Sequence, residues 1–212
     1  MKFSKNMLLL YAVTDRKQED KEIFYKQIED ALKGGVTMLQ LREKNLDEEE
    51  LIKEAMEIKK ICAVYNVPLI INDNVDAAIK SGADGVHVGI EDTPVSLIRQ
   101  KVGKDFIIGA TAKTIEQAKE AERAGADYLG VGAVFPSPTK KNAIRITTDQ
   151  LNEICSSVSI PAVAIGGISL DNVDEIKGTD INGIAVVSAI FAADNIESAA
   201  YKLKEKAREI IL

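Results

Sequence analysis

The chain has 212 residues, with 27 Lys and Arg against 33 Asp and Glu, and a formal net charge of −6. Hydrophobic residues make up 46% and charged residues 28%, which is usual for a globular domain and excludes disordered, collagen-like and coiled-coil proteins. The acidic balance argues against a nucleic-acid-binding surface and against an anionic membrane surface. It does not exclude a local basic pocket.

Cysteine and histidine are too scarce for a zinc site. The chain has two cysteines, Cys62 and Cys155, without a CxxC pair, and one histidine. We expect both thiols to be free, buried and in a reducing compartment. No apolar run has the pattern of a signal peptide or approaches the ~20 residues of a membrane span, so we expect a cytoplasmic protein.

Short apolar runs alternate with charged segments of helical period along the whole chain. The runs lie at residues 7–15, 37–44, 67–73, 85–90, 106–112, 128–135, 160–167 and 183–191. Continuous apolar runs are typical of strands buried on both faces in a parallel sheet. Helical spacing is clearest at residues 20–33, 47–65, 114–124 and 194–211, and weakest at 74–81 and 93–101.

Eight strands, each followed by a helix, predict an α/β fold, a single (β/α)8 TIM barrel. No linker or low-complexity stretch interrupts the series, so we expect one domain over residues 1–212. An open, doubly wound sheet is the alternative, and the count of eight favours closure. Active sites of such barrels lie at the C-terminal ends of the strands.

The second predicted strand ends in polar residues of one parity. Gln40, Arg42 and Lys44 alternate with Leu39 and Leu41, so the leucines should pack on helices while the polar side chains face the barrel axis. Two cations beside a glutamine favour an anionic ligand. The alternative is an exposed strand end with solvated charges.

Carboxylates follow the third and fourth strands at Asp73 and Asp92. They could neutralise the nearby cations, act as acid and base, or hold a divalent ion. Carboxylates completed by water and phosphate suit Mg²⁺, and Arg42 and Lys44 make a Mg²⁺–diphosphate site the more coherent interpretation. His87 lies inside the fourth strand, where a hydrogen-bonded core residue is favoured over a general base.

Two later loops also have features of phosphate sites. Gly130 and Gly132 clear one face of the sixth strand, and the loop that follows carries hydroxyls and cations at Ser137, Thr139, Lys140 and Lys141. This loop is not a Walker A sequence, but its length suits a functional lid. At the ends of strands seven and eight, Gly166–Gly167 and Ser188 suggest a second, backbone-built anion site.

Together these residues resemble the thiamine-phosphate synthases, also called thiamine-phosphate pyrophosphorylases. The resemblance covers nearly the whole chain. It rests on YAVTD at 11–15, QLREK at 40–44, ND at 72–73, HVGxxD at 87–92, GAT at 109–111, FPSPTK at 135–140, GGI at 166–168 and VSAI at 187–190.

The resemblance implies condensation of an aminopyrimidine-methyl diphosphate with a thiazole phosphate to give thiamine phosphate and pyrophosphate, by departure of pyrophosphate before the thiazole attacks. It implies Mg²⁺ as the cofactor, with Asp73 and Asp92 as its ligands. Diphosphate contacts are implied at Arg42, Lys44, Asn72, Ser137, Thr139 and Lys140, of which Arg42, Lys44 and Lys140 would be catalytic. Pyrimidine contacts are implied at Gln40 and Thr111, and thiazole-phosphate contacts at Gly167, Val187, Ser188 and Ile190.

Three positions depart from what the family usually carries. Ile90 stands where glutamine is common, Thr111 where serine is commoner, and Lys113 where many relatives have histidine. These changes bear on pyrimidine recognition and not on the reaction class. The nearest alternative is the related thiazole tautomerase, which uses a histidine near position 113 and lacks much of the diphosphate apparatus. A non-catalytic ligand-binding barrel is the second alternative. The expected partners are small-molecule substrates, with no nucleic acid and no membrane, and the sequence leaves open whether the chain forms a homo-oligomer.

Overall fold

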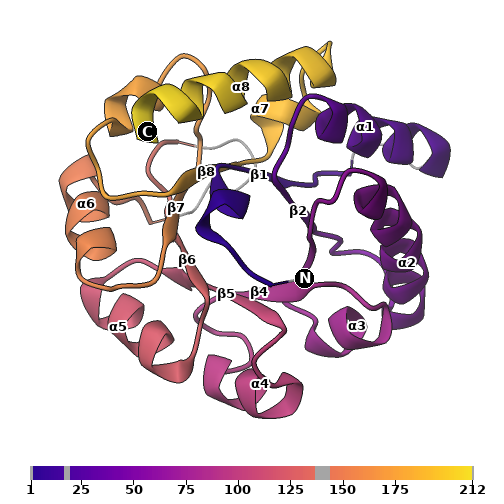
Figure 1. Cartoon of the computed structure of the whole chain (residues 1–212), viewed down its shortest axis with the longest axis horizontal. Helices are drawn as coiled ribbons and strands as arrows, with labels where there is room; N and C mark the ends of the chain where they lie inside the picture. The colour runs from indigo at the N-terminus through magenta and orange to yellow at the C-terminus, as the bar shows by residue number, and fades with distance from the viewer. Residues whose placement is uncertain (1, 17–19, 137–143, 212) are drawn as a thin grey trace.

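The chain folds as a closed barrel of eight parallel strands surrounded by helices (Figure 1). The computed structural model describes residues 2–16, 20–136 and 144–211. The strands are β1 (Leu10–Val13), β2 (Met38–Leu41), β3 (Leu69–Asn72), β4 (Gly85–Val88), β5 (Ile107–Ala112), β6 (Tyr128–Gly132), β7 (Ala162–Ile165) and β8 (Gly183–Val186). They pair in chain order, and β8 closes the barrel against β1. The predicted (β/α)8 barrel and all eight predicted strands are therefore confirmed.

The helices surround the strands in chain order (Figure 1). They are α1 (Lys21–Lys33), α2 (Glu48–Val64), α3 (Val75–Lys80), α4 (Val95–Val102), α5 (Ile115–Ala124), α6 (Thr148–Ser156), α7 (Ser188–Phe191) and α8 (Ile196–Ile211), with 3₁₀ helices η1 (Lys5–Leu8) and η2 (Val173–Ile176). None of the helices in the described ranges is long and apolar enough to cross a membrane. Helix α8 lies against α1, so the last helix completes the outer layer beside the first (Figure 1).

Two predicted elements differ from the structure around the last two strands. The crossover after β7 contains only the four-residue helix η2. Just before this helix, the Ser169 N–H donates to the side-chain oxygen of Asn172, and just after it Gly178, at φ 85°, turns the chain. The apolar run 183–191, predicted as one strand, is β8 followed by the single turn α7. An apolar run does not distinguish strand from buried helix.

Side-chain caps fix where most of the helices begin. Asp20, Asp47, Asn74, Thr114 and Thr147 each accept a hydrogen bond from a backbone N–H in the first turn of the helix that follows. Such caps satisfy amides that have no partner within the helix. Asn74 and Thr114 lie only two residues beyond the ends of β3 and β5, so these two caps also fix the short loops that follow those strands at the C-terminal end of the barrel.

The strands divide their side chains between two apolar layers. Leu39 and Leu41 belong to the layer between the barrel and the helices, which also holds both buried free cysteines, Cys62 and Cys155. Burial raises the pKa of each thiol to about 12. The alternate residues face the axis, as the alternation at Gln40 predicted.

Within the barrel, the half near the strand N-termini is filled by apolar side chains. Its buried members are Leu8, Tyr11, Met38, Ile70, Ile107, Tyr128, Val163 and Ala185. We call this set the lower layer. The N-terminal segment crosses this end of the barrel (Figure 1), and its Phe3 ring stacks on Tyr128 with 5.9 Å between ring centroids.

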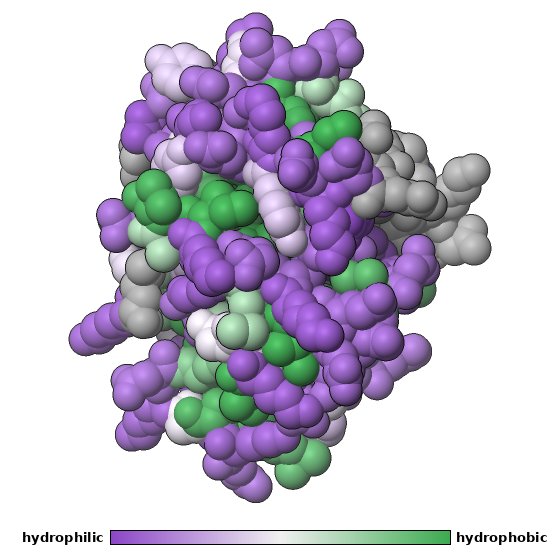
Figure 2. All heavy atoms as spheres, turned by 90° about the vertical axis from the view of Figure 1, so that its right-hand side faces the viewer, coloured by the Kyte–Doolittle hydropathy of each residue, from purple (hydrophilic) through white to green (hydrophobic). Residues whose placement is uncertain are grey.

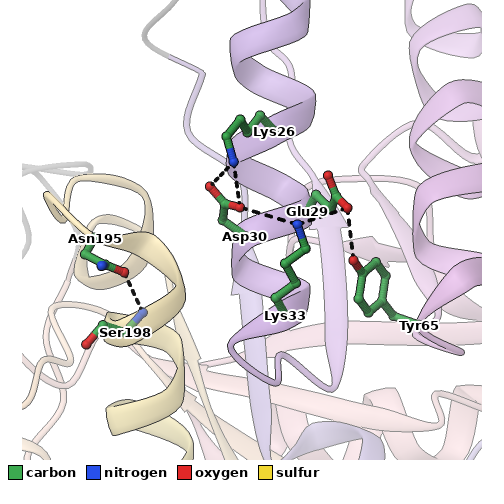
Figure 3. Close-up of polar contacts among 7 residues, drawn as sticks. All are labelled: Lys26, Glu29, Asp30, Lys33, Tyr65, Asn195 and Ser198. Carbon is green, nitrogen blue, oxygen red and sulfur yellow. Dashed lines mark hydrogen bonds and ion pairs between the residues drawn. The ribbon is translucent and has the colours of Figure 1, made fainter.

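The surface over α1, α2 and α3 is mostly hydrophilic (Figure 2). On this face, hydrophobic side chains form separate patches among polar ones. The exposed side of α1 carries ion pairs: Lys33 Nζ lies 3.1 Å from Glu29, and Lys26 Nζ lies 3.0 Å from Asp30 (Figure 3). The Tyr65 hydroxyl donates to Glu29 Oε1 at 3.1 Å. Exposed pairs of this kind contribute little to stability.

Candidate active site

A cavity of about 200 Å³ opens at the C-terminal end of the barrel. Its floor is part of the lower layer, at Tyr11, Val163 and Ala185. Polar side chains line the wall two residues beyond other members of the lower layer, where Gln40 follows Met38 and Asn72 follows Ile70. The lining residues above the floor include Val13, Gln40, Arg42, Asn72, His87, Thr111, Lys113, Gly130, Gly132, Ile165, Gly166, Gly167, Val187 and Ser188.

A continuous set of hydrogen bonds crosses the barrel below this wall. Gln40 Nε2 donates to the Tyr11 hydroxyl at 2.6 Å, and that hydroxyl lies 2.8 Å from the Tyr128 hydroxyl. His87 Nδ1 lies 3.1 Å from the Tyr128 hydroxyl, and His87 Nε2 lies 3.1 Å from Thr111 Oγ1. His87 is thus a hydrogen-bonded core residue, as the sequence favoured, and it also lines the cavity.

Burial keeps the titratable members of this set neutral near pH 7. It raises the pKa of both tyrosine hydroxyls, Tyr11 and Tyr128, far above their ordinary value. Burial also lowers the pKa of His87 from 6.5 to about 4, although the Asp92 carboxylate partly opposes this shift. The deep wall of the cavity therefore offers hydrogen bonds without charge.

Positive charge lies nearer the mouth. Arg42 follows β2, is partly buried and lines the cavity, and its backbone N–H donates to Thr14 Oγ1 at 2.9 Å. Lys113 follows β5 and also lines the cavity. Lys44 is exposed and does not line it, which corrects the prediction that it shares the inward face with Arg42. Because β2 ends at Leu41, the strand alternation no longer governs position 44.

Asp73 and Asp92 form a carboxylate pair at the rim. Burial and the neighbouring Asp92 carboxylate raise the pKa of Asp73 to about 6, against the Asn72 hydrogen bond and the field of Arg42. Asn72 Nδ2 donates to Asp73 Oδ2 at 2.5 Å, and the Gly89 amide donates to Asp92 Oδ2 at 2.6 Å. Two like charges held this close are stabilised by a cation between them.

The donor set is small. Within residues 2–16, 20–136 and 144–211, no group of three or more His, Cys, Asp or Glu lies close enough together to hold a metal ion. A structural zinc or calcium cage is therefore a poor fit here. Two carboxylates are what Mg²⁺ takes from a protein when water and substrate phosphate complete its shell. The pair fits that ion.

The turn after β7 brings backbone close to the cavity. Gly166 and Gly167 have φ of 102° and 67°, a conformation that favours glycine. A Cβ at Gly167 would lie 2.2 Å from the Pro136 carbonyl oxygen, so the chain after β6 passes directly over this turn. Val187 and Ser188 line the cavity beside it. Ile190 is fully buried in the outer apolar layer, and its side chain does not line the cavity.

Comparison with known proteins identifies the family. A model of the family described as thiamine monophosphate synthase matches residues 10–190. The chain belongs to this family. Relatives named thiamine-phosphate synthase include one from Clostridium tetani, 47% identical, covering 92% of this chain and 93% of the relative. Another, thiamine-phosphate synthase 2 from Streptococcus pneumoniae serotype 4, is 43% identical over 98% of this chain and 99% of the relative.

A solved structure gives the same result. The thiamine phosphate pyrophosphorylase from Pyrococcus furiosus is 37% identical to this chain and superimposes on it with a TM-score of 0.89. The match covers 98% of this chain and 99% of that one. The resemblance to the thiamine-phosphate synthases is thereby confirmed, and membership of the thiamine monophosphate synthase family makes the chain a transferase.

The sequence-predicted site residues divide into three groups. The structure brings Gln40, Arg42, Asn72, Thr111, Gly167, Val187 and Ser188 to one cavity and sets Asp73 and Asp92 close together, with Asp73 beside Asn72 and within the field of Arg42. Lys44 and the Ile190 side chain lie away from the cavity. Ser137, Thr139, Lys140 and Lys141 lie outside the described residues. The role of each residue stays a prediction.

Sequence reasoning missed the contribution of the two tyrosines. Tyr11 lines the cavity, and the Tyr128 hydroxyl links the Tyr11 hydroxyl to His87 by hydrogen bonds. The signal was available in the alternation: Tyr128 shares its parity with Gly130 and Gly132, whose inward face was recognised. Lys113 was noted only as a departure from the family, whereas it lines the cavity.

Proposed function

We propose that the protein is a Mg²⁺-dependent thiamine-phosphate synthase. Its substrates would be 4-amino-2-methyl-5-(diphosphooxymethyl)pyrimidine and 4-methyl-5-(2-phosphoethyl)thiazole, and its products thiamine phosphate and pyrophosphate. The observation that carries this proposal is the Asp73–Asp92 pair, of which Asp73 lies within the field of Arg42, and Arg42 itself lines a cavity whose deeper wall is uncharged. That arrangement suits a diphosphate at the mouth and a neutral heterocycle inside.

The diphosphate end of the substrate would be bound by the rim. Arg42 offers a planar, permanently charged fork for phosphate oxygens, and the Asn72 amide lies beside it on the cavity wall. Lys140, Thr139 and Ser137 follow β6 in the sequence and complete the proposed set. Arg42 and Lys140 are the residues to which we assign catalysis, and Lys44 is left out because it is exposed and does not line the cavity.

The two heterocycles would occupy the interior. Gln40 and Thr111 lie on the uncharged wall and are assigned to the aminopyrimidine. Gly167, Val187 and Ser188 are assigned to the thiazole phosphate, because the glycine turn leaves backbone accessible to phosphate oxygens. Ile190 would contribute through its backbone, since its side chain is buried in the core.

The proposed reaction is dissociative. The bond between the pyrimidine methylene carbon and the diphosphate oxygen breaks first, and pyrophosphate leaves with the electron pair. The thiazole nitrogen then supplies the pair that forms the new carbon–nitrogen bond to the pyrimidine carbocation. Negative charge gathers on the departing group, so the rim cations would bind it more strongly in the transition state than in the ground state. The apolar floor would keep water from the cation.

Mg²⁺ would be held by Asp73 and Asp92, and when bound it would neutralise charge on the diphosphate. The raised pKa of Asp73 supports this assignment, because burial and the neighbouring Asp92 carboxylate disfavour its charged form and a bound cation would favour that form. The hydrogen bonds from Asn72 and the Gly89 amide each fix Oδ2 of one carboxylate and so hold the two groups in place.

The decisive experiment follows both products. Purified protein is incubated with both substrates, with Mg²⁺ or with a chelator, and pyrophosphate and thiamine phosphate are measured. We expect equal amounts of the two products, only when both substrates and Mg²⁺ are present. If neither product forms with Mg²⁺ present, the synthase assignment is wrong. Conversion of a thiazole phosphate alone, without pyrophosphate, would indicate the isomerase alternative, and binding without turnover would indicate a ligand-binding barrel.

A further inference from the structure

We propose that Tyr11, Tyr128 and His87 form a directional hydrogen-bond chain that makes Gln40 an acceptor and Thr111 a donor toward the cavity. The three residues would be positioning residues, because their polar atoms bond to one another and to Gln40 and Thr111, the two side chains that turn polar groups toward a ligand. The direction of the chain concerns the protein alone. Its effect on substrate choice rests on the function proposed above.

The chain is continuous and crosses five strands. It runs from Gln40 on β2 through Tyr11 on β1 and Tyr128 on β6 to His87 on β4 and Thr111 on β5, with donor–acceptor distances of 2.6, 2.8, 3.1 and 3.1 Å. Tyr11, Tyr128 and His87 are buried, with exposed fractions of 1%, 0% and 9%. Bulk water therefore does not take the place of these hydrogen-bond partners. The polar hydrogens of Tyr11, Tyr128 and His87 must each be donated to a neighbour in the hydrogen-bond chain.

The direction follows from counting donors. Gln40 Nε2 can only donate, so the Tyr11 oxygen accepts. Within the described part of the chain, the Tyr11 hydroxyl has one other partner, the Tyr128 oxygen, which must receive its hydrogen. Tyr128 then donates to His87 Nδ1. This direction requires both tyrosines to be protonated and His87 to be neutral, and the burial of all three side chains favours these uncharged forms.

The far end of the chain fixes the histidine tautomer. A neutral imidazole that accepts at Nδ1 carries its hydrogen on Nε2, and that hydrogen is donated to Thr111 Oγ1. The Thr111 hydroxyl hydrogen has no acceptor among the described residues, and Thr111 lines the cavity. At the other end, the Gln40 carbonyl oxygen is likewise left for a ligand. The cavity thus presents one acceptor and one donor of fixed polarity.

The surroundings hold the chain in place. A Cβ at Gly109 would lie 2.2 Å from Tyr128 Cζ and 2.5 Å from His87 Nδ1, so a glycine there makes the Tyr128–His87 contact possible. A Cβ at Gly130 would lie 3.0 Å from His87 Cε1. The Tyr128 ring is further fixed by Phe3, which stacks on it, and by the edge of Tyr11, 5.8 Å away between centroids. These contacts restrict the rings to one arrangement.

This polarity matches one class of heterocycle. An aminopyrimidine has an amino group that donates and ring nitrogens that accept, which suits an acceptor at Gln40 and a donor at Thr111. In the oxopyrimidine a carbonyl that accepts replaces the amino group that donates. The Gln40 oxygen would then face a group of the same kind, and unpaired polar groups in such a site discriminate strongly.

The single histidine of the chain makes the direction directly measurable. Tag-free, ligand-free protein labelled with ¹⁵N-histidine is examined by NMR at pH 7. We expect an unprotonated, hydrogen-bonded Nδ1 and a protonated Nε2. In Tyr128→Phe the Nδ1 signal should shift toward that of an imidazole without a donor, whereas Tyr65→Phe, which removes a surface hydroxyl, should change nothing. The opposite tautomer in the wild type would mean that the chain runs in reverse, and it would overturn the proposal.

Kinetics tests the effect on the substrate. In Tyr11→Phe and Tyr128→Phe we expect KM for the aminopyrimidine diphosphate to rise about tenfold, with KM for the thiazole phosphate unchanged. Inhibition by the oxopyrimidine analogue should strengthen relative to the amino compound by a similar factor. Equal pyrimidine KM values in active wild type and both variants would refute the positioning role. If the wild type makes no thiamine phosphate, the proposed function fails, while the NMR experiment still decides the direction of the chain.

Discussion

The lower and upper halves of the barrel interior differ sharply, although they are built from the same strands. Below, Met38, Ile70 and Ile107 are fully or almost fully buried and pack against one another. Two residues further along the same strands stand Gln40, Asn72 and Gly109, which border or lie beneath a cavity. A shift of two residues along a strand therefore leads from side chains that pack the interior to positions at the cavity. Substitutions at the first kind of position should mainly change stability, and those at the second should mainly change activity.

Tyr11 and Tyr128 lie at the boundary between the two halves. Their rings belong to the lower layer and their hydroxyls belong to the hydrogen-bond chain under the cavity. A filled lower half thus does more than stabilise the barrel, because it also fixes the rings whose hydroxyls hold the upper half in place. Substitutions in the two halves should separate these contributions.

The largest effect is expected in the lower half, from Ile70→Ala. Ile70 is fully buried, and truncating such a side chain removes ~2–5 kcal/mol from the free energy of unfolding because a cavity is left behind. Urea unfolding measures this loss. Turnover per folded molecule should stay close to that of the wild type. A loss well below 1 kcal/mol would show that the lower layer is not densely packed.

In the upper half, pH should affect stability through His87. The folded protein keeps this side chain neutral down to about pH 4, whereas the unfolded chain protonates it below its ordinary value of 6.5. The unfolded state then binds more protons, so the free energy of unfolding falls as pH drops from 6.5 to 4, by at most ~3 kcal/mol.

Urea unfolding of the wild type and of His87→Gln across this pH range isolates that contribution, because the carboxylates titrate in both proteins. Stability of the wild type should fall more steeply with acid than that of His87→Gln. Parallel curves would show that His87 is not held neutral.

At the rim, Asp92→Asn should remove activity and leave stability intact. Asparagine keeps an oxygen for the Gly89 amide, so the loop is preserved while the charge is lost. We expect turnover to fall about 100-fold, as when a charge-stabilising group is removed from an active site. Steady-state kinetics at saturating Mg²⁺ and urea unfolding give the two numbers.

Asp76→Asn is the matched control for Asp92→Asn, because Asp76 is an exposed carboxylate paired with Lys101 outside the cavity. Its turnover should equal that of the wild type. Near-wild-type turnover in Asp92→Asn would contradict the role assigned to Asp92. We expect the same loss of turnover in Lys140→Ala, the predicted contact from the loop after β6.

The smallest effect is expected outside the barrel. Glu29→Gln breaks the ion pair with Lys33 but keeps an oxygen for the Tyr65 hydroxyl (Figure 3). Because these groups are exposed, the urea midpoint and turnover should not change measurably. A clear loss of stability would mean that the surface contacts of α1 matter as much as the interior ones.

Local patterns in the sequence predicted most of the fold. Alternation placed Gln40 inward and Leu39 outward, and the count of apolar runs predicted closure of the barrel. The errors arose where the alternation of side chains along a strand no longer applies or does not distinguish a strand from a helix. Lys44 lies beyond the last residue of β2, where parity no longer applies, and the run that contains Ser188 is apolar in both β8 and α7.

The sequence could place single residues, because Arg42 lines the cavity and Asp73 lies close to Asp92 as their positions after the strands indicated, while their roles stay predictions. The hydrogen-bond chain was not predictable, because its members come from five strands and Tyr11 contacts a residue 117 positions away. Each tyrosine resembles an ordinary core residue in its own segment. Only the closed barrel shows that the two hydroxyls meet.

Closure of the barrel also constrains how the protein is made. Leu10 pairs with Ile184, so β1 cannot form this contact until the ribosome has synthesised β8. Until then β1 and β7 each have an unpaired edge, and such edges promote aggregation. Gln40 and Ser188 line the same cavity from opposite sides of this seam. A nascent chain therefore has no binding pocket before its eighth strand emerges, and the barrel acquires its pocket only as the seam closes.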